Sequence, residues 1–208
     1  MNDIEAYREY PYLTHWYNKL WVSEQLKYHC GPAGLAPDVS GWYVVRPIVN
    51  LSGMSIGAKK IWIDAGDCKQ VPPGYFWCEW FDGRQFSVTY RWEGWSWVPV
   101  SCWEGIKSDE DLSKFSKWIK TDHYPPLGIF FHELSDLEMI NVEYIEDKPI
   151  EVHLRTSSDP DYNELIPVWK GQENLVDKHV VMGYSYISSY DDGEGFLEQP
   201  RLGFLVKN

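Results

Sequence analysis

Apolar and polar residues alternate on both sides of the turn-like stretch EDKP in the segment NVEYIEDKPIEVHLR, residues 141–155. Alternation with a period of two is typical of half-buried strands, so the segment predicts a β-hairpin. Residues two apart in a strand point to the same side of the sheet. One face of this hairpin is therefore expected to carry four polar side chains: Glu143, Glu151, His153 and Arg155.

Two further segments have apolar residues near helical spacing. In the first, Tyr12 to Tyr28, the positions of Trp16, Leu20 and Leu26 predict one amphipathic helix that ends before Gly31. In the second, DEDLSKFSKWIK, Asp109 is in a suitable N-cap position. Its apolar positions, which predict a second helix, are Leu112, Phe115, Trp118 and Ile119.

Strand patterns account for most of the remaining chain. The expected strands are WYVVRPI (42–48), KKIWID (59–64), YFWCEWF (75–81), RQFSVTYRW (84–92), WSWVPVSCW (95–103) and a last strand at 201–206. The turn residues Asp82 and Gly83 predict that strands 75–81 and 84–92 form a hairpin. Antiparallel hairpins mixed with a few helices favour an α+β fold over an alternating parallel α/β fold.

Length and charge narrow the class of protein. A chain of 208 residues can form one large domain or two closely packed subdomains. The formal net charge of −12 argues against broad attraction to a nucleic acid backbone or to an anionic membrane. No apolar run is long enough for a membrane span, and the first residues lack the pattern of a secretory signal. We therefore expect a cytoplasmic protein that binds neither membranes nor nucleic acid backbones.

Cysteine spacing and the lack of a nucleophile motif argue against a structural zinc site and against a hydrolase active site. The four cysteines form no C-x-x-C pair, so we expect reduced thiols and no structural zinc site. No serine or cysteine stands in a G-x-S-x-G motif, so hydrolase chemistry gains no support.

Three polar or aromatic segments each have two interpretations. NLSGMSIGA, residues 50–58, is either an ordinary strand connection or a phosphate-covering flap, with Arg46 supplying charge from the preceding strand. In TSSDPDYNEL, Asp159, Asp161 and Asn163 either contact a substrate or form a local turn, and the turn is favoured. The pair of tryptophans in GWSW either stacks on a carbohydrate or packs in the core, and the core is favoured.

Taken in order, VVRP, NLSGMSIGA, FWCEWFDG, FSVTY, NVEYI and IEVHLR resemble the ATP-grasp family over roughly residues 42–158. The resemblance implies two small α+β subdomains with mainly antiparallel sheets that sandwich a nucleotide. We expect a short N-terminal helical segment in residues 1–40, a nucleotide-binding subdomain in 41–100 and a larger subdomain with the hairpin in 101–208.

The resemblance also assigns residues to the binding of ATP. Arg46 corresponds to a basic residue that holds phosphates, and the glycines of the flap are Gly53 and Gly57. The hinge, where backbone groups read the adenine edge, and the position near the ribose correspond to Glu79, Trp80, Phe81 and Gln85.

On the hairpin, Glu143 and Glu151 correspond to the family's metal-binding carboxylates, and Arg155 to an arginine that faces the reacting groups. Mg²⁺ prefers oxygen ligands, which these carboxylates supply independently of the resemblance. His153 stands where the family has Asn, so either Mn²⁺ is tolerated or His153 hydrogen-bonds without ligating; direct participation at the metal is the favoured interpretation. A second nucleotide-contacting lysine, found N-terminal to this region in many members, has no secure counterpart in this sequence.

The family implies an ATP-dependent ligase that uses ATP and Mg²⁺ to activate a carboxylate as an acylphosphate. Attack by an amine or similar nucleophile would then complete the reaction. The partners would be a small-molecule or peptide carboxylate and the nucleophile. Two alternatives are a nucleotide-binding module without turnover and an aromatic-rich β-protein that binds a carbohydrate or a protein.

Overall fold

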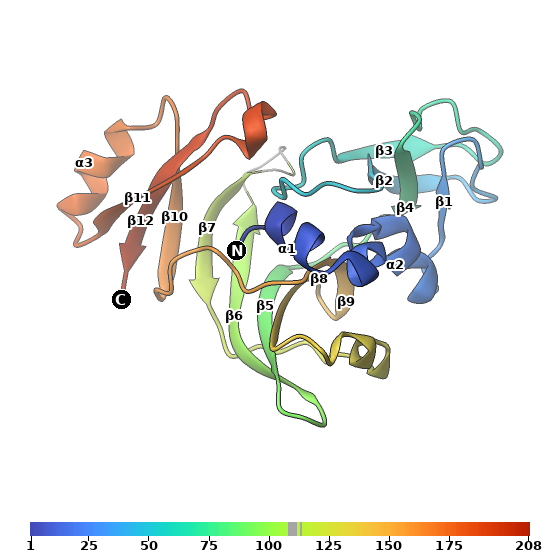
Figure 1. Cartoon of the computed structure of the whole chain (residues 1–208). Coiled ribbons are helices and arrows are strands. Elements are labelled where there is room, and N and C mark those ends of the chain that lie inside the picture. Colours follow the sequence, from blue (N-terminus) through green and yellow to red (C-terminus); the bar gives the residue numbers. More distant parts are fainter. Residues whose placement is uncertain (108–111, 113) are drawn as a thin grey trace.

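Two antiparallel sheets organise the protein, as seen in a computed structural model that describes residues 1–107, 112 and 114–208 (Figure 1). The small sheet has the order β1-β4-β2-β3, with β1 Cys30–Pro32, β2 Gly41–Pro47, β3 Lys59–Ile63 and β4 Tyr75–Glu79. The large sheet has the order β11-β12-β10-β7-β6-β5-β8-β9. The predicted α+β class with mainly antiparallel sheets is confirmed.

The large sheet extends from the predicted hairpin to the C-terminal strands. Its members are β5 Gln85–Trp92, β6 Trp97–Lys107, β7 Phe115–Lys120, β8 Met139–Ile145, β9 Lys148–His153, β10 Glu164–Trp169, β11 Ser185–Asp191 and β12 Arg201–Lys207. The chain passes from one sheet to the other between Glu79 and Gln85, the segment assigned to the hinge. The expected subdomain boundary at residues 100 and 101 falls within β6, and the subdomain limits stay a prediction.

The N-terminal segment forms three short helices: α1 Asp3–Glu9, the 3-10 helix η1 Pro11–Tyr17 and α2 Lys19–Gln25. The single helix predicted for residues 12–28 is thus wrong. Asn18 has an extended backbone conformation, and its side chain accepts a hydrogen bond from the backbone N–H of Trp21. Because Asn18 caps α2, the helical segment breaks there and Lys19 begins a new helix on the buried side.

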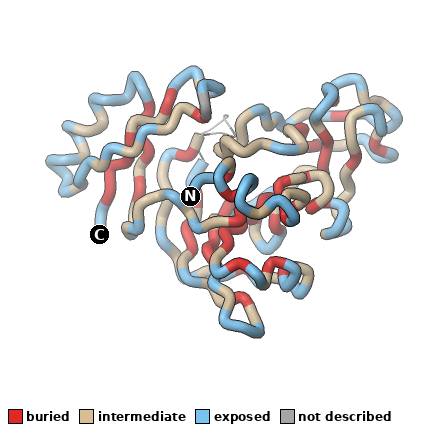
Figure 2. The backbone as a smooth tube through the Cα atoms, viewed as in Figure 1, coloured by how far each residue is buried: buried red, intermediate tan, exposed pale blue. Residues whose placement is uncertain are grey.

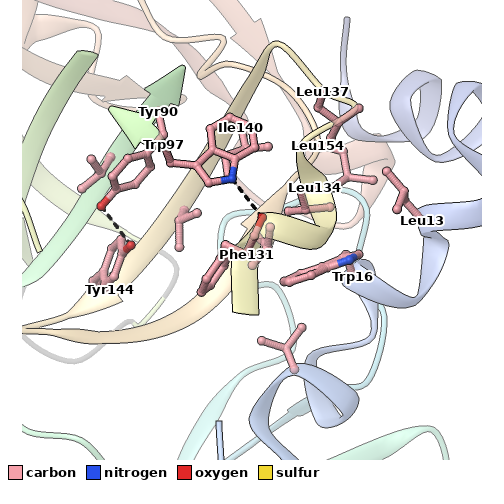
Figure 3. Close-up of a cluster of buried hydrophobic side chains, with 14 of the residues drawn as sticks. Leu13, Trp16, Tyr90, Trp97, Phe131, Leu134, Leu137, Ile140, Tyr144 and Leu154 are labelled. Atoms are coloured by element: carbon pink, nitrogen blue, oxygen red, sulfur yellow. Dashed lines mark hydrogen bonds between the residues drawn. The ribbon is translucent and has the colours of Figure 1, made fainter. Parts of the chain in front are cut away.

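The main hydrophobic core lies between these helices, the 3-10 helix η2 Ile129–Leu134 and the large sheet (Figure 3). Trp16 packs against Phe131, with 5.3 Å between ring centroids. Trp97 donates a hydrogen bond from its indole to the carbonyl of Phe131 at 2.9 Å. Figure 2 shows buried residues concentrated in the central strands, whereas α3 Asn174–Val180 has no buried residue. The remaining short helix is η3 Gly193–Gly195.

The hairpin predicted for residues 141–155 is present as β8 and β9. The hairpin predicted between residues 75–81 and 84–92 is wrong, because β4 pairs with β1 and β2 while β5 pairs with β6 and β8. Asp82 and Gly83 therefore connect two sheets rather than two neighbouring strands.

The second predicted helix is also wrong where the structure describes it. Residues 115–120 form β7, between β6 and β10, and Asp109 lies outside the described residues. Neighbours on both sides supply the backbone hydrogen bonds of a strand, and this tertiary pairing overrides the local helical spacing. Phe115 and Trp118 lie over Gly105 of β6, where a Cβ atom would come within 2.7 and 2.8 Å of the two rings.

The cysteines, the GWSW segment and the helices bear on three smaller expectations. All four cysteines are free thiols, with Cys78 and Cys102 buried and the other two partly exposed. In the GWSW segment Trp97 belongs to the core, whereas Trp95 is exposed. Among the described helices, none is long and apolar enough to cross a membrane.

Gly105→Ala should destabilise the protein by on the order of 1–3 kcal/mol, because the new methyl group forces Phe115 and Trp118 off β6. Gly128→Ala is the matched control, since a Cβ there meets no atom within 4 Å. Urea unfolding of the two variants measures the difference. Equal unfolding midpoints would show that the two rings move aside at no cost.

Candidate functional site

Two adjacent pockets lie on either side of the loop formed by residues 50–58, which we call the flap. The first pocket has a volume of about 70 Å³ and is lined by Lys19, Arg46, Glu79 and Glu151 among others. The second pocket has a volume of about 130 Å³ and includes Glu143. Ser55 of the flap and Gln85 of β5 line both pockets, so the flap and β5 form the border between them.

The flap has an unusual backbone. Four of its residues have positive φ: Gly53 (66°), Met54 (50°), Ser55 (50°) and Gly57 (80°). At Gly57 a Cβ would lie 2.9 Å from the Tyr75 hydroxyl, so this position requires glycine for space as well as conformation. The side chain of Asn50 holds the start of the loop, because it donates to the carbonyl of Gly53 and accepts from the N–H of Ser52.

The residues assigned to the hinge line the first pocket between the two sheets. Glu79 is tied to the N-terminal segment, because its side chain accepts a hydrogen bond from the backbone N–H of His29 at 3.0 Å. Trp80 and Phe81 each lie beneath a lysine ammonium group at 4.2 Å from the ring centroid, that of Lys60 and Lys148 respectively. Recognition of adenine by this segment stays a prediction.

Arg46 and Lys19 bring positive charge to the first pocket. Arg46 is almost fully buried and donates from Nη2 to the carbonyl of Ile150 at 2.9 Å, while its Nε has no partner among the described residues. Lys19 is buried as well, and its Nζ lies 2.9 Å from Oε1 of Glu151. The sequence analysis missed Lys19. The available signal was its place three residues from Trp16 and three from Val22, on the apolar face of the helical segment.

The hairpin brings its carboxylates together as the alternation predicted. Glu143 lies directly opposite Glu151 in the register of β8 and β9. The side chain of Gln85 donates to Glu143 at 3.0 Å. His153 faces both glutamates, since its Nε2 is 3.9 Å from Oε1 of each.

Asp3, from the first helix, completes this cluster and was also missed in the sequence. Its Oδ2 lies 3.0 Å from Nδ1 of His153 and accepts a hydrogen bond from Nη2 of Arg155 at 2.6 Å. The hydroxyl of Tyr17 donates to Oδ1 at 3.3 Å. No local pattern connects Asp3 to residues 150 positions away, so only the folded chain could reveal this contact.

Burial and charge set the protonation states of the cluster. Burial lowers the pKa of His153, but Asp3 and the two glutamates outweigh it and raise this pKa to about 10. Burial raises the pKa of Asp3, yet His153 and Arg155 hold it well below its usual range. Burial also raises the pKa of Glu151, and Lys19, His153 and Arg46 lower it below its ordinary value. At neutral pH the cluster is therefore an array of paired charges.

A divalent cation fits the two glutamates better than it fits His153. Within the described residues, no group of three His, Cys, Asp or Glu side chains is arranged to hold a metal ion. Mg²⁺ needs only one or two protein carboxylates when phosphates and water supply the other ligands, and the cross-strand pair Glu143 and Glu151 meets that requirement. A protonated His153 has no lone pair at Nε2 to donate, so it would have to lose a proton before it could ligate a metal, while its Nδ1 lies 3.0 Å from Asp3. Its role beside a bound metal stays a prediction.

The far end of the second pocket contains residues from the C-terminal strands. Arg201 of β12 lies 3.5 Å from both Asp159 and Asp191. Asp159 lines the second pocket, and its contact with a substrate stays a prediction. Asp161 instead pairs with Lys120 at 2.7 Å, and Asn163 does not line either pocket.

Comparison with known proteins gives matches at the level of structure. No protein-family model and no curated protein sequence matches the chain. Carboxyaminoimidazole ribonucleotide synthase from Aspergillus clavatus, solved with ATP, is 8% identical, with a TM-score of 0.59, over 92% of this chain and 68% of that one. N5-carboxyaminoimidazole synthetase from Staphylococcus aureus, solved with ADP, is 11% identical, with a TM-score of 0.54, over 92% and 68% of the two chains.

A third match is an ATP-grasp superfamily protein from Archaeoglobus fulgidus, at 13% identity and a TM-score of 0.42 over 69% of this chain. The chain spans only 47% of the length of that protein. At such identities, what the matches share with this chain is the fold.

Asp3→Asn should lower the free energy of unfolding at pH 7 by on the order of 3 kcal/mol, because buried His153 and Arg155 lose their carboxylate partner. The folded-state pKa of Asp3 is depressed, so its contribution is present above the unfolded pKa of about 3.9 and is lost as the pH falls through the folded pKa. Urea unfolding of metal-free protein from pH 7 to pH 3 should show a constant difference in stability down to about pH 4 and only the start of a decrease below it, because the folded pKa of Asp3 lies lower still.

Asp136→Asn, at an exposed aspartate, is the control and should change stability by less than about 0.5 kcal/mol. A deficit in Asp3→Asn no larger than that of the control would show that the cluster does not depend on this carboxylate.

Proposed function

We propose that this chain, which has the ATP-grasp fold, is an ATP-dependent ligase that activates a carboxylate for attack by an amine or similar nucleophile. One observation carries the proposal. The cations Lys19 and Arg46 line the first pocket together with Glu151, and Glu143, opposite Glu151 on the hairpin, lines the second; residues of the glycine-containing flap line both pockets. This arrangement suits a nucleotide on one side and an acceptor on the other.

ATP would occupy the first pocket. The backbone of residues 79–81 would read the adenine edge, and Gln85, which lines the same pocket, would lie near the ribose. Arg46 and Lys19 would bind phosphate oxygens, where charge-assisted hydrogen bonds are strong because the site is buried. Backbone N–H groups of the flap, including those of Gly53 and Gly57, would cover the phosphates.

Glu143 and Glu151 would hold Mg²⁺, or Mn²⁺ in its place, against the phosphates. When bound, the cation would neutralise charge that develops on the transferred phosphoryl group. Because Lys19 already binds Glu151, nucleotide binding would draw Lys19 towards a phosphate and release that carboxylate. His153 would remain on Asp3 and orient the two glutamates.

In this chemistry the protein would mainly position the reacting groups and neutralise their charge. An oxygen of the substrate carboxylate attacks the γ-phosphorus, ADP departs and an acylphosphate forms. A nucleophile then attacks the carbonyl carbon, loses a proton, and inorganic phosphate departs. Arg155, fixed by Asp3 and the carbonyl of Thr156, would stabilise negative charge on the transferred group.

A nucleotide-binding module without turnover is the second candidate. Its support is the 2.9 Å ion pair of Glu151 with Lys19, through which a residue of the chain itself compensates the buried carboxylate. The third interpretation, a carbohydrate-binding or protein-binding β-protein, has no specific contact in its favour.

ATP binding is the first test. Titration calorimetry with ATP and Mg²⁺ should detect binding, and millimolar nucleotide should raise the melting temperature because it binds only the folded state. Arg46→Met should weaken ATP binding by about 1.5–3 kcal/mol, because a charge-assisted phosphate contact is lost.

Arg91→Met removes an exposed arginine outside both pockets and should bind ATP like the wild type. If neither calorimetry nor the melting temperature detected nucleotide binding by the wild type, both the ligase and the nucleotide-binding module would be ruled out.

Glu151→Gln separates the ligase from the module. In the wild type, Mg²⁺ or Mn²⁺ should tighten ATP binding. The variant should still bind ATP without metal, but it should lose about tenfold or more of the affinity that the cation adds. His153→Asn should change the ratio of the Mn²⁺ and Mg²⁺ gains only if His153 ligates the metal.

Glu138→Gln, at an exposed glutamate, is the control for charge removal. A wild-type protein in which neither cation affects ATP binding would favour the module without turnover.

A further inference from the structure

We propose that the second pocket binds an aromatic carboxylic acid, with its carboxylate at Arg155 and its ring against a wall of four aromatic side chains. That this acid is the substrate to be activated rests on the proposed function; its binding does not. The wall consists of Trp103 of β6, Phe115 and Trp118 of β7, and Trp169 of β10.

The aromatic wall is held in place from behind. The indole of Trp103 donates to the carbonyl of Tyr162 at 3.2 Å, which satisfies its only polar atom. Phe115 and Trp118 lie 4.3 Å apart at their ring centroids, over the space left by the missing side chain of Gly105. Trp103, Phe115 and Trp169 are almost fully buried, and Trp118 is partly buried. Rigid aromatic rings that line a pocket favour a flat apolar ligand, because little conformational entropy is lost on binding.

Arg155 supplies the anion-binding end. Its Nη2 and Nη1 donate to Asp3 and to the carbonyl of Thr156, but its buried Nε has no partner among the described residues. Arg201 likewise has a buried Nε without a described partner in the same pocket. A buried N–H left unpaired is unfavourable, so a ligand oxygen that accepts these hydrogen bonds would bind favourably.

The order of strands brings the two ends together in one pocket. The glutamate pair lies on β8 and β9 at one edge of the large sheet, while the wall lies on β6, β7 and β10 towards its middle. The segment from Arg155 to Asn163 passes from β9 back to β10, and Arg155 and Asp159 on this segment both line the pocket. A carboxylate at Arg155 would therefore share the pocket with Glu143, and an attached ring would extend over the wall.

Arg201 closes the far end. It lies 3.5 Å from both Asp159 and Asp191, and burial raises the pKa of Asp159 above its ordinary value. Aromatic amino acids carry the same ring and carboxylate as simple aromatic acids and belong in the same chemical class. Their α-ammonium group is attached next to the carboxylate, so it would lie at the Arg155 end of the pocket.

The test is a panel of small ligands, titrated into the whole chain with ADP and Mg²⁺ and without them, and followed by ligand-observed NMR. The panel consists of 3-phenylpropionate, L-phenylalanine, phenethylamine and acetate. The first two should bind at least about tenfold more tightly than the last two, because only they carry both the ring and the carboxylate. Saturation transfer should be strongest at the ring protons. Phenethylamine binding as tightly as 3-phenylpropionate, or acetate doing so, would overturn the proposal.

Trp118→Leu should weaken 3-phenylpropionate binding by about fivefold or more and leave ATP affinity unchanged, because Trp118 lines only the second pocket. Trp118→Phe should retain binding within about threefold, since a ring is kept. Trp62→Leu, at an exposed tryptophan outside both pockets, is the control. Equal affinity in Trp118→Leu and the control would contradict the wall.

Melting temperatures establish that each variant is folded, and the wild-type panel decides the question if Trp118→Leu is not. ATP binding without any binding of the aromatic acids overturns this inference and leaves the proposed function standing. Binding of the aromatic acids without ATP binding overturns the proposed function and leaves this inference standing.

Discussion

The carboxylate of Asp3 holds the candidate site together, because a single oxygen is shared by His153 and Arg155 in a buried position. Without this partner two cations would be buried without compensation, which is strongly unfavourable. The first helix is therefore part of the site and not an appendage to it. Its capping box, made by Asn2 and Glu5, fixes the helix start at which Asp3 stands.

Charge pairing recurs across the first pocket. Lys19 on Glu151, with Arg46 donating to the neighbouring carbonyl of Ile150, keeps the buried charges balanced before any ligand arrives. A phosphate-bearing ligand with its cation can exchange partners with these pairs at little electrostatic cost, since each charge lost is replaced by another. The same balance is why a metal-free nucleotide site is a coherent second candidate.

The large sheet joins this charged end to an apolar one. Because β6, β7 and β10 are neighbours, aromatic residues distant in the sequence form one wall, and Gly105 gives their rings the space to lie on the sheet. The flap, with Gly57 packed against Tyr75, separates the resulting pocket from the one that Arg46 lines. The second pocket thus combines an aromatic wall with charged groups, and it shares one border with the first pocket.

The sequence by itself determined the α+β class, most strands and the common face of Glu143, Glu151 and His153, because strand alternation is a local property. The sequence did not determine which partners the strands on either side of Asp82 and Gly83 pair with. Nor did it determine that residues 115–120 form a strand, since both features depend on which distant strands supply hydrogen bonds. Lys19 and Asp3 entered the site only through tertiary structure, because their partners lie more than a hundred residues away and no local pattern records such a contact.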